Sequence, residues 1–197
     1  MALTKLNNNG IAGVTALPSS IALGDMVLVS SATASSSASL SFTLGDYKEY
    51  QFYFVNIHPS TSSYLTFQVS TNNGSSYGIA LTSTTFRAYH FENGSSSVLQ
   101  YDNADQANGT AFQDLIVGSI GTDNDQSCAG TLTLFNPSST TYAKHYMSTT
   151  NAYQGTPLTL NGFTAGYFNT TSALTNIRFQ MSSGNIDAGT ILMYGIN

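Results

Sequence analysis

Short runs in which apolar and polar residues alternate follow one another along most of the chain, and helical spacing is nearly absent. Alternation is the period of a β-strand with one buried face. The runs predict strands over residues 26–31, 38–44, 48–57, 64–69, 85–92, 96–101, 112–117, 130–135, 142–148, 173–181 and 190–194. Many short strands joined by turns predict an all-β fold, a jelly-roll-like antiparallel β-sandwich. An up-and-down barrel stays open as an alternative, because one sequence does not show strand order.

The run 48–57 is the most apolar of these strands, and it is apolar on both faces. Tyr50, Phe52 and Phe54 fall on one face, and Tyr53, Val55 and Ile57 fall on the other. Apolar side chains on both faces of a strand require cover on both. We therefore expect a second sheet on one side, and another element or subunit on the other.

Turn residues separate the strands. Asn73-Gly74 and Asn93-Gly94 are dipeptides of tight hairpin turns, so they predict two sharp reversals, the second between the fifth and sixth predicted strands. Asn136-Pro137 predicts a type I turn. The stretch 182–185 separates the last two strands. In the first of these two strands, Ile177, Phe179 and Met181 alternate and are expected to face the same way.

Residues 1–25 differ from the rest of the chain, because they are rich in Gly, Asn and Ser and carry only scattered apolar residues. Such a segment predicts an extended N-terminal arm that provides attachment or oligomer contacts. Residues 26–197 predict one β-sandwich domain, and the length of 197 residues suits a single core.

Charge is scarce in this sequence. Charged residues make up 8% of the chain, about a quarter of it is Ser or Thr, and the formal net charge is −5. A surface of neutral hydroxyls and amides without a basic stripe argues against nucleic-acid binding. No apolar run reaches the length of a membrane span, and residues 1–5 lack the hydrophobic stretch of a signal peptide. We expect no nucleic-acid or membrane partner, and synthesis in a cytoplasm without export by that route.

The residue patterns predict no catalytic residue and no cofactor. His58 follows the most apolar strand without a neighbouring nucleophile or carboxylate, so it is expected to cap the strand end rather than act as a base. His90 and His145 are expected to be ordinary strand residues, since their spacing matches no metal-ligand motif. The lone Cys128 lacks a Cys–His or Cys-x-x-Cys context and predicts a small buried thiol.

Two acidic loops are the candidates for metal binding. Asp102 and Asp105 lie in the first loop, and Asp123 and Asp125 in the second. Oxygen-rich loops can bind Ca²⁺, but neither loop follows the calcium-loop consensus or ends in a bidentate Glu. Asp and Asn are also the residues that turns prefer. We therefore expect solvated turns and no metal, with weak calcium sites as the alternative.

Aromatic side chains on a surface can stack on sugar rings, which is the basis of a second functional hypothesis. The chain has no Trp, the strongest such platform, but Tyr77, Tyr89, Tyr101 and Tyr153 could take its place. Tyr is equally common at the edge of a core, so both interpretations stay open.

Several stretches resemble a family of virion structural proteins of tailed phages, of marine and cyanophage-like type. The stretches are 47–59, 65–77, 124–130, 134–141 and 177–196. The last one, which contains SSGNIDAGTI followed by YGI, is the most recognisable. The resemblance spans residues 26–196, and it transfers no catalytic residues. In addition, residues 2–5 and 10–12 are similar to the attachment ends of some phage fibres.

The resemblance implies a non-enzymatic structural protein on the outside of a bacteriophage virion, either a capsid decoration (cement) protein or a short head or tail fibre. It also implies capsid or tail proteins as partners, a homo-oligomer with a trimer favoured, and synthesis in the host bacterial cytoplasm. The alternative is a receptor module that binds host-surface glycan through Tyr- and Asn-rich loops. A polysaccharide depolymerase is a third class, disfavoured because the chain lacks the long repeats of β-helical enzymes.

Overall fold

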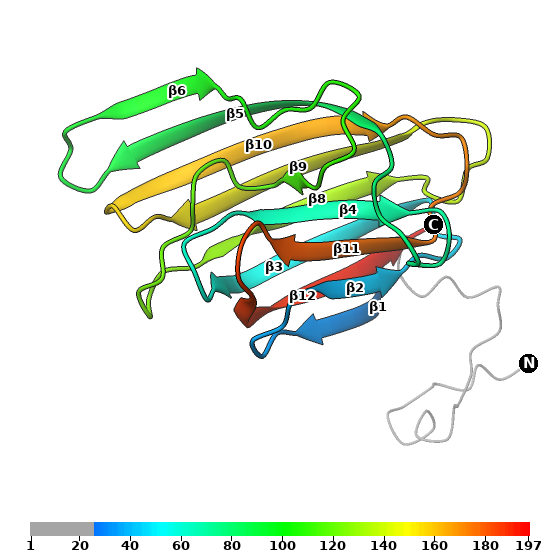
Figure 1. Ribbon diagram of the computed structural model, residues 1–197, viewed down its shortest axis with the longest axis horizontal. Helices are drawn as coiled ribbons and strands as arrows, with labels where there is room; N and C mark the ends of the chain where they lie inside the picture. Colours follow the sequence, from blue (N-terminus) through cyan, green and yellow to red (C-terminus); the bar gives the residue numbers. More distant parts are fainter. Residues whose placement is uncertain (1–25) are drawn as a thin grey trace, which may run out of the picture.

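The computed structural model describes residues 26–197, which form twelve β-strands and no helix. The strands are β1 (Met26–Thr33), β2 (Leu40–Thr43), β3 (Glu49–Pro59), β4 (Leu65–Ser70), β5 (Leu81–Phe91), β6 (Ser97–Tyr101), β7 (Gln113–Asp114), β8 (Cys128–Phe135), β9 (Lys144–Tyr153), β10 (Leu158–Phe168), β11 (Asn176–Met181) and β12 (Ile186–Ile196). They form a large sheet in the order β1-β12-β3-β8-β9-β10-β5-β6 and a small sheet in the order β2-β11-β4-β7 (Figure 1). The predicted all-β antiparallel sandwich is confirmed, whereas the predicted arm, residues 1–25, lies outside the described residues. No helix long and apolar enough to cross a membrane occurs in the described part.

Four pairs of antiparallel neighbours are nested within one another along the chain. β1 pairs with β12, β2 with β11, β3 with β8, and β4 with β7. The first and third pairs belong to the large sheet, and the second and fourth to the small sheet. This half of the structure is therefore a long antiparallel hairpin rolled up on itself. The roll closes where β12 lies beside β3 and β11 lies beside β4.

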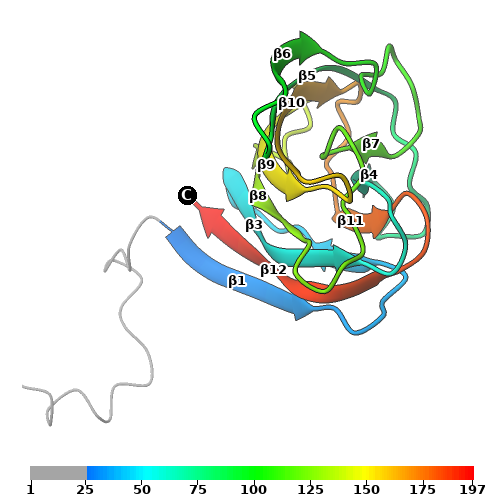
Figure 2. The ribbon, with the colours of Figure 1, turned by 90° about the vertical axis from the view of Figure 1, so that its left-hand side faces the viewer.

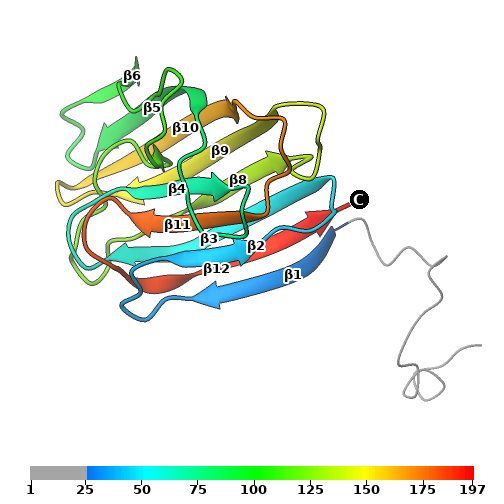
Figure 3. The same ribbon diagram turned by 45° about the vertical axis from the view of Figure 1, so that its right-hand side comes forward.

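Two insertions widen the large sheet. β5 and β6 come between β4 and β7 in the chain, and β9 and β10 come between β8 and β11. β10 pairs with both β9 and β5, so strands from distant parts of the sequence form one continuous block, β9-β10-β5-β6. We call this block the extension. It reaches beyond the area over which the small sheet packs (Figure 3).

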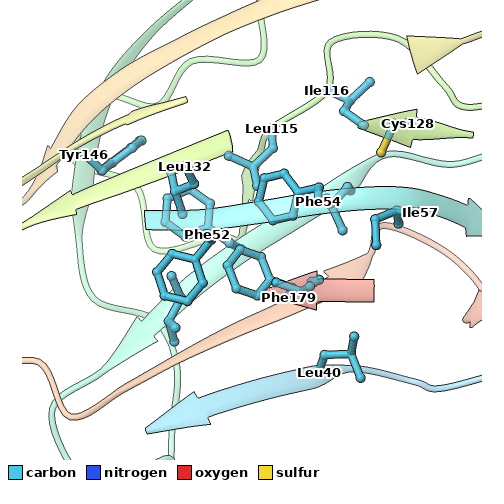
Figure 4. Close-up of a cluster of buried hydrophobic side chains, with 14 of the residues drawn as sticks. Leu40, Phe52, Phe54, Ile57, Leu115, Ile116, Cys128, Leu132, Tyr146 and Phe179 are labelled. Carbon is cyan, nitrogen blue, oxygen red and sulfur yellow. The ribbon is translucent and has the colours of Figure 1, made fainter. Parts of the chain in front are cut away.

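The core between the two sheets is dominated by aromatic rings. Phe179 of β11 contacts Phe52 and Phe54 of β3 at ring-centroid distances of 5.2 and 5.3 Å (Figure 4). Phe67 of β4 contacts Tyr146 of β9 edge-on at 5.0 Å. Such pairs contribute about 0.5–1.5 kcal/mol each beyond the burial of their area. Phe179 therefore joins the small sheet to the centre of the large one.

The inner face of the extension is covered by an irregular segment rather than by a strand. Only Gln113 and Asp114 of the predicted strand 112–117 pair with β4, because the chain then turns so that Leu115 and Ile116 enter the core. The hydroxyl of Thr150 on β9 donates to the carbonyl oxygen of Leu115 at 2.6 Å. In Figure 2, this segment and the small sheet lie on the same side of the large sheet.

Three turn predictions have different outcomes. Asn93-Gly94 joins β5 and β6 as a hairpin, as predicted. Asn73 and Gly74 have positive φ angles of 56° and 77° and form a turn. The next strand, however, is in the other sheet, so the prediction of a hairpin at this turn is wrong. At Asn136, the amide of Ser139 donates to the Asn136 carbonyl at 3.1 Å, which confirms the turn.

A β-bulge in β3 corrects the predicted face of Ile57. Asn56 has a φ of 51°, and the register with β8 shifts between Phe54 and Ile57. An extra residue in a strand inverts the alternation of the side chains beyond it. Ile57 therefore lies in the core with Phe54, whereas Val55 stays 42% exposed on the outer face.

The strand β10 was not predicted, since its apolar pattern is interrupted by glycines. Leu158, Leu160 and Phe168 point inward from β10 and are apolar, as the inward positions of a strand usually are. Gly162 and Gly166 occupy two further inward positions of the same strand. A Cβ atom at Gly166 would meet the carbonyl oxygen of Thr82 and lie 2.9 Å from the hydroxyl of Tyr146. The glycine thus leaves room for a ring on the neighbouring strand.

Replacing Phe179 tests how the two sheets are held together. Phe179→Ala removes the ring that contacts β3 and β4, so we expect the free energy of unfolding to fall by about 3–5 kcal/mol. Urea unfolding followed by fluorescence measures the loss. Tyr142→Ala, at a position that is 71% exposed, is the control and should change the stability by less than about 0.5 kcal/mol. Equal losses in both variants would contradict the role of Phe179.

Candidate interaction surface

The outer face of the large sheet, which points away from the small sheet, carries a cluster of exposed and partly exposed apolar side chains. We call this cluster the outer patch, and its residues are Phe86, Phe135, Met147, Phe163, Ala165 and Tyr167. All except Phe135 belong to the extension. The side chains of β9 alternate between buried and exposed, and the inward ones fill the core. Met147 occupies an outward position and is therefore 59% exposed.

The register of the sheet places outward side chains in rows across the strands. Phe163 of β10 lies opposite Phe86 of β5, and the two rings stack with centroids 4.7 Å apart. The same row continues through Thr149 and Thr131 to Tyr53 on β3. Cross-strand neighbours of this kind lie within about 5.5 Å of one another. The row is therefore a continuous strip of aromatic and threonine side chains.

Two adjoining depressions hollow the outer patch, with volumes of about 320 and 570 Å³. They share Thr84, Phe135, Met147 and Ala165. Neither lining contains an Asp, Glu, Lys or Arg residue, and His145 is the one histidine among the lining residues. A surface of this kind offers apolar contact and hydroxyl groups, but no fixed charge.

The sequence predicted that another element or subunit would cover the second face of β3. Tyr53 on that face packs against Tyr194 of β12 at 5.5 Å, and Val55 is exposed. No segment within residues 26–197 buries the outer patch, which lies on the same face of the sheet. Cover by another subunit stays a prediction.

A polar cluster lies on the other side of the extension. The guanidinium Nε of Arg87 is 3.0 Å from a carboxylate oxygen of Asp102, and Arg87 also donates to the carbonyl of Val117 at 3.2 Å. A shallow depression of about 240 Å³ is lined by Arg87 and Asp102 together with Asp114 and Tyr64. Sequence reasoning missed Asp114, because it lies inside an apolar stretch and matches no motif. Burial, and to a lesser degree the charge of Asp102, raise the pKa of Asp114 to about 6.

Two of the four predicted acidic residues make local side-chain contacts. Asp102 pairs with Arg87, and Asp105 accepts a hydrogen bond from the hydroxyl of Tyr101 at 2.9 Å. The loop of Asp123 and Asp125 is closed by Gln126, whose amide N donates to the Asp123 carbonyl at 2.8 Å. Within residues 26–197, no three His, Cys, Asp or Glu side chains form a group that could hold a metal ion.

The three histidines lie on different strands, and Cys128 on β8 pairs with Ile57, the residue before His58. His58 lies at the end of β3, and its Nδ1–H donates to the carbonyl oxygen of Gln126 at 2.6 Å. His90 is exposed on β5, and His145 on β9 lies 6.0 Å from the ring of Tyr167. Cys128 is buried, as predicted, and burial raises the pKa of its thiol.

The tyrosines proposed for sugar binding lie on different segments. Tyr77 lies beneath the guanidinium of Arg178, which is 4.1 Å from the ring centroid. Tyr89 packs against the core. Tyr101 is 60% exposed at the end of β6. Tyr153 lies near Glu92, whose charge raises the pKa of the Tyr153 hydroxyl. Of the four, Tyr101 offers the most exposed ring.

Comparison with known proteins adds no family assignment. No model of a protein family matches this chain, and no curated protein matches it. The outer patch and the depression at Asp114 are therefore assessed on their geometry alone.

The raised pKa of Asp114 predicts a pH-dependent stability. Its pKa is about 6 in the folded protein and near 3.8 without the shift, so the folded state binds the proton more tightly. Stability should therefore fall as the pH rises from about 4 to about 6, and stay lower above that range. Asp114→Asn should remove this fall and stabilise the protein at pH 7 by about 1–2 kcal/mol, allowing for partial exposure.

Urea unfolding at a series of pH values measures the effect. Asp187→Asn, at an exposed position of β12, is the matched control and should leave the pH dependence unchanged. A fall between pH 4 and 6 that survives in Asp114→Asn would show that another group is responsible.

Proposed function

We propose that this chain is a non-enzymatic structural protein of a bacteriophage virion, an exterior module such as a capsid decoration protein or a short head or tail fibre. The observation that carries the proposal is the outer patch, an uncharged apolar surface that the described chain leaves open. Contiguous apolar surface on a folded protein is typical of an interaction site. A module that assembles with other virion proteins needs such a surface.

The connectivity of the strands supports the same proposal. The four nested pairs alternate between the two sheets, which is the arrangement expected of a jelly roll with two Greek keys. We propose that the core is a jelly roll enlarged by the extension. Jelly rolls occur in viral capsid and lectin domains, and the sequence resemblance points to virions among these.

The engagement of the reactive side chains supports a non-enzymatic role. Asp102 is held by Arg87, His58 by a backbone carbonyl, and Cys128 lies in the core. A general base must reach its substrate, and a cysteine nucleophile must be ionised at the working pH. These groups instead stabilise the fold around the loops that follow β3, β6 and β7.

Analysis of purified particles tests the proposed function. We expect mass spectrometry of virions of the phage that encodes this chain to detect it as a component. Hundreds of copies per particle would indicate a decoration protein, and a handful would indicate a fibre. Particles that lack the chain would refute the proposal.

Recognition of a host-surface glycan is a second candidate, and one observation favours it. Tyr101 exposes its ring beside Asp105, which is the pairing of an apolar platform with a hydrogen-bonding carboxylate that sugars use. On a glycan array, wild-type protein should bind a defined sugar, and Tyr101→Ala should reduce the signal at least about tenfold. Tyr142→Ala is the matched control, at another highly exposed tyrosine. Equal binding by both variants would exclude Tyr101 as the platform.

A further inference from the structure

We propose that two copies of this chain associate through the outer patch about a two-fold axis, each copy covering the patch of the other. This inference rests on the proposed function, because that proposal is also argued from the outer patch. The partner that the inference assigns to the patch is a second copy of this chain.

The distribution of charge favours a second copy. The chain has a formal net charge of −5, so identical copies repel one another wherever acidic side chains meet. The linings of the two depressions contain no Asp, Glu, Lys or Arg. Two copies can meet at this surface without placing like charges opposite each other, whereas a strongly charged partner would find no complementary charge there.

The size of the surface is sufficient for a stable dimer. Eight strands about 4.8 Å apart, each presenting about eight residues at about 3.3 Å per residue, make an outer face of about 900 Å². Each partner in a standard stable interface contributes about 800 Å². The outer face as a whole, edge strands included, therefore provides the required area, and the outer patch is its apolar part.

The shape of the patch suits a two-fold arrangement. In a two-fold dimer the same surface of both copies must be self-complementary. The outer patch combines depressions with an exposed side chain, Met147, that lines both of them. Met147 of each copy can enter a depression of the other, and the flexible thioether of methionine adapts to such a space.

The chemistry of the lining favours a protein over a sugar at this place. Sugar sites fix the orientation of hydroxyl groups with a few directed polar side chains. The polar side chains of the linings are Thr and Ser, the tyrosines Tyr146 and Tyr167, and His145, with no Asn, Gln, Asp or Glu. Stacked Phe86 and Phe163 instead provide the apolar centre that protein interfaces bury.

Sedimentation velocity on the full-length protein at micromolar concentrations tests the inference. We expect a mass of two chains, twice 20.9 kDa. Met147→Asp would place two carboxylates in an apolar interface and should weaken association by about 100-fold or more. Tyr142→Asp, at an exposed position outside the patch, should associate like the wild type. Circular dichroism confirms that both variants are folded.

Thiol labelling provides a second measurement, because Cys128 is buried and does not compete. Thr149→Cys lies in the row that crosses the patch and should react at least about tenfold more slowly in the dimer than when combined with Met147→Asp. A monomeric wild type, the trimer that the family resemblance favours, or association and labelling that Met147→Asp leaves unchanged would each overturn the inference. So would a glycan that binds the patch of a monomeric wild type. The virion proposal has a separate test, since it depends on finding the chain in particles whether or not it dimerises.

Discussion

The pairing of β10 with both β5 and β9 is the interaction on which the distinctive half of this structure depends. Without the pairing of β10 with β5, the two insertions would be the separate hairpins β5-β6 and β9-β10 on either side of a rolled-up sandwich. With it, they form one sheet that continues the core sheet through β8. A longer sheet creates two new faces. The inner one is covered by the segment before β8, and the outer one carries the exposed aromatic side chains.

Small and polar residues make this arrangement possible on the inner side. Gly166 leaves room for the ring of Tyr146 on β9. The buried amide of Gln113 accepts from the hydroxyl of Ser83 at 2.6 Å and donates to the carbonyl of Ala104 at 2.8 Å. Buried Gln68 likewise donates to the carbonyl of Ala111 at 3.0 Å. Buried polar groups require partners, so these amides fix the irregular backbone that replaces a second-layer strand.

The sequence predicts the fold class and most strands because alternation is a local signal. Ile177, Phe179 and Met181 alternate and all lie in the core, as their spacing indicates. β10 escapes such a prediction, since the volume at Gly162 and Gly166 is supplied by side chains of neighbouring strands. Ile57 escapes it because a single inserted residue changes the face. Asp114 is likewise not recognisable from the local sequence, since its pKa depends on burial by segments that are distant in the sequence.

The outer patch illustrates a related limit. Apolar residues at alternate positions of β5, β9 and β10 look like ordinary strand residues, and only the register between these strands brings Phe86, Met147 and Phe163 together. The sequence does indicate that β3 carries apolar residues on both faces. It cannot show that the exposed surface is concentrated on the extension, because strand order decides that.

The nested pairing has a consequence for how the protein is made. Met26 lies opposite Ile196, so the first strand of the described chain hydrogen-bonds with the last. On a ribosome the N-terminal strands emerge well before their partners, and domains whose contacts join distant residues fold slowly. The backbone of β1 must therefore stay unpaired until β12 has been synthesised. A chain interrupted before β12 would lose the strand that joins β1 to β3. We expect such fragments to be captured by chaperones or degraded rather than to accumulate as partial sandwiches.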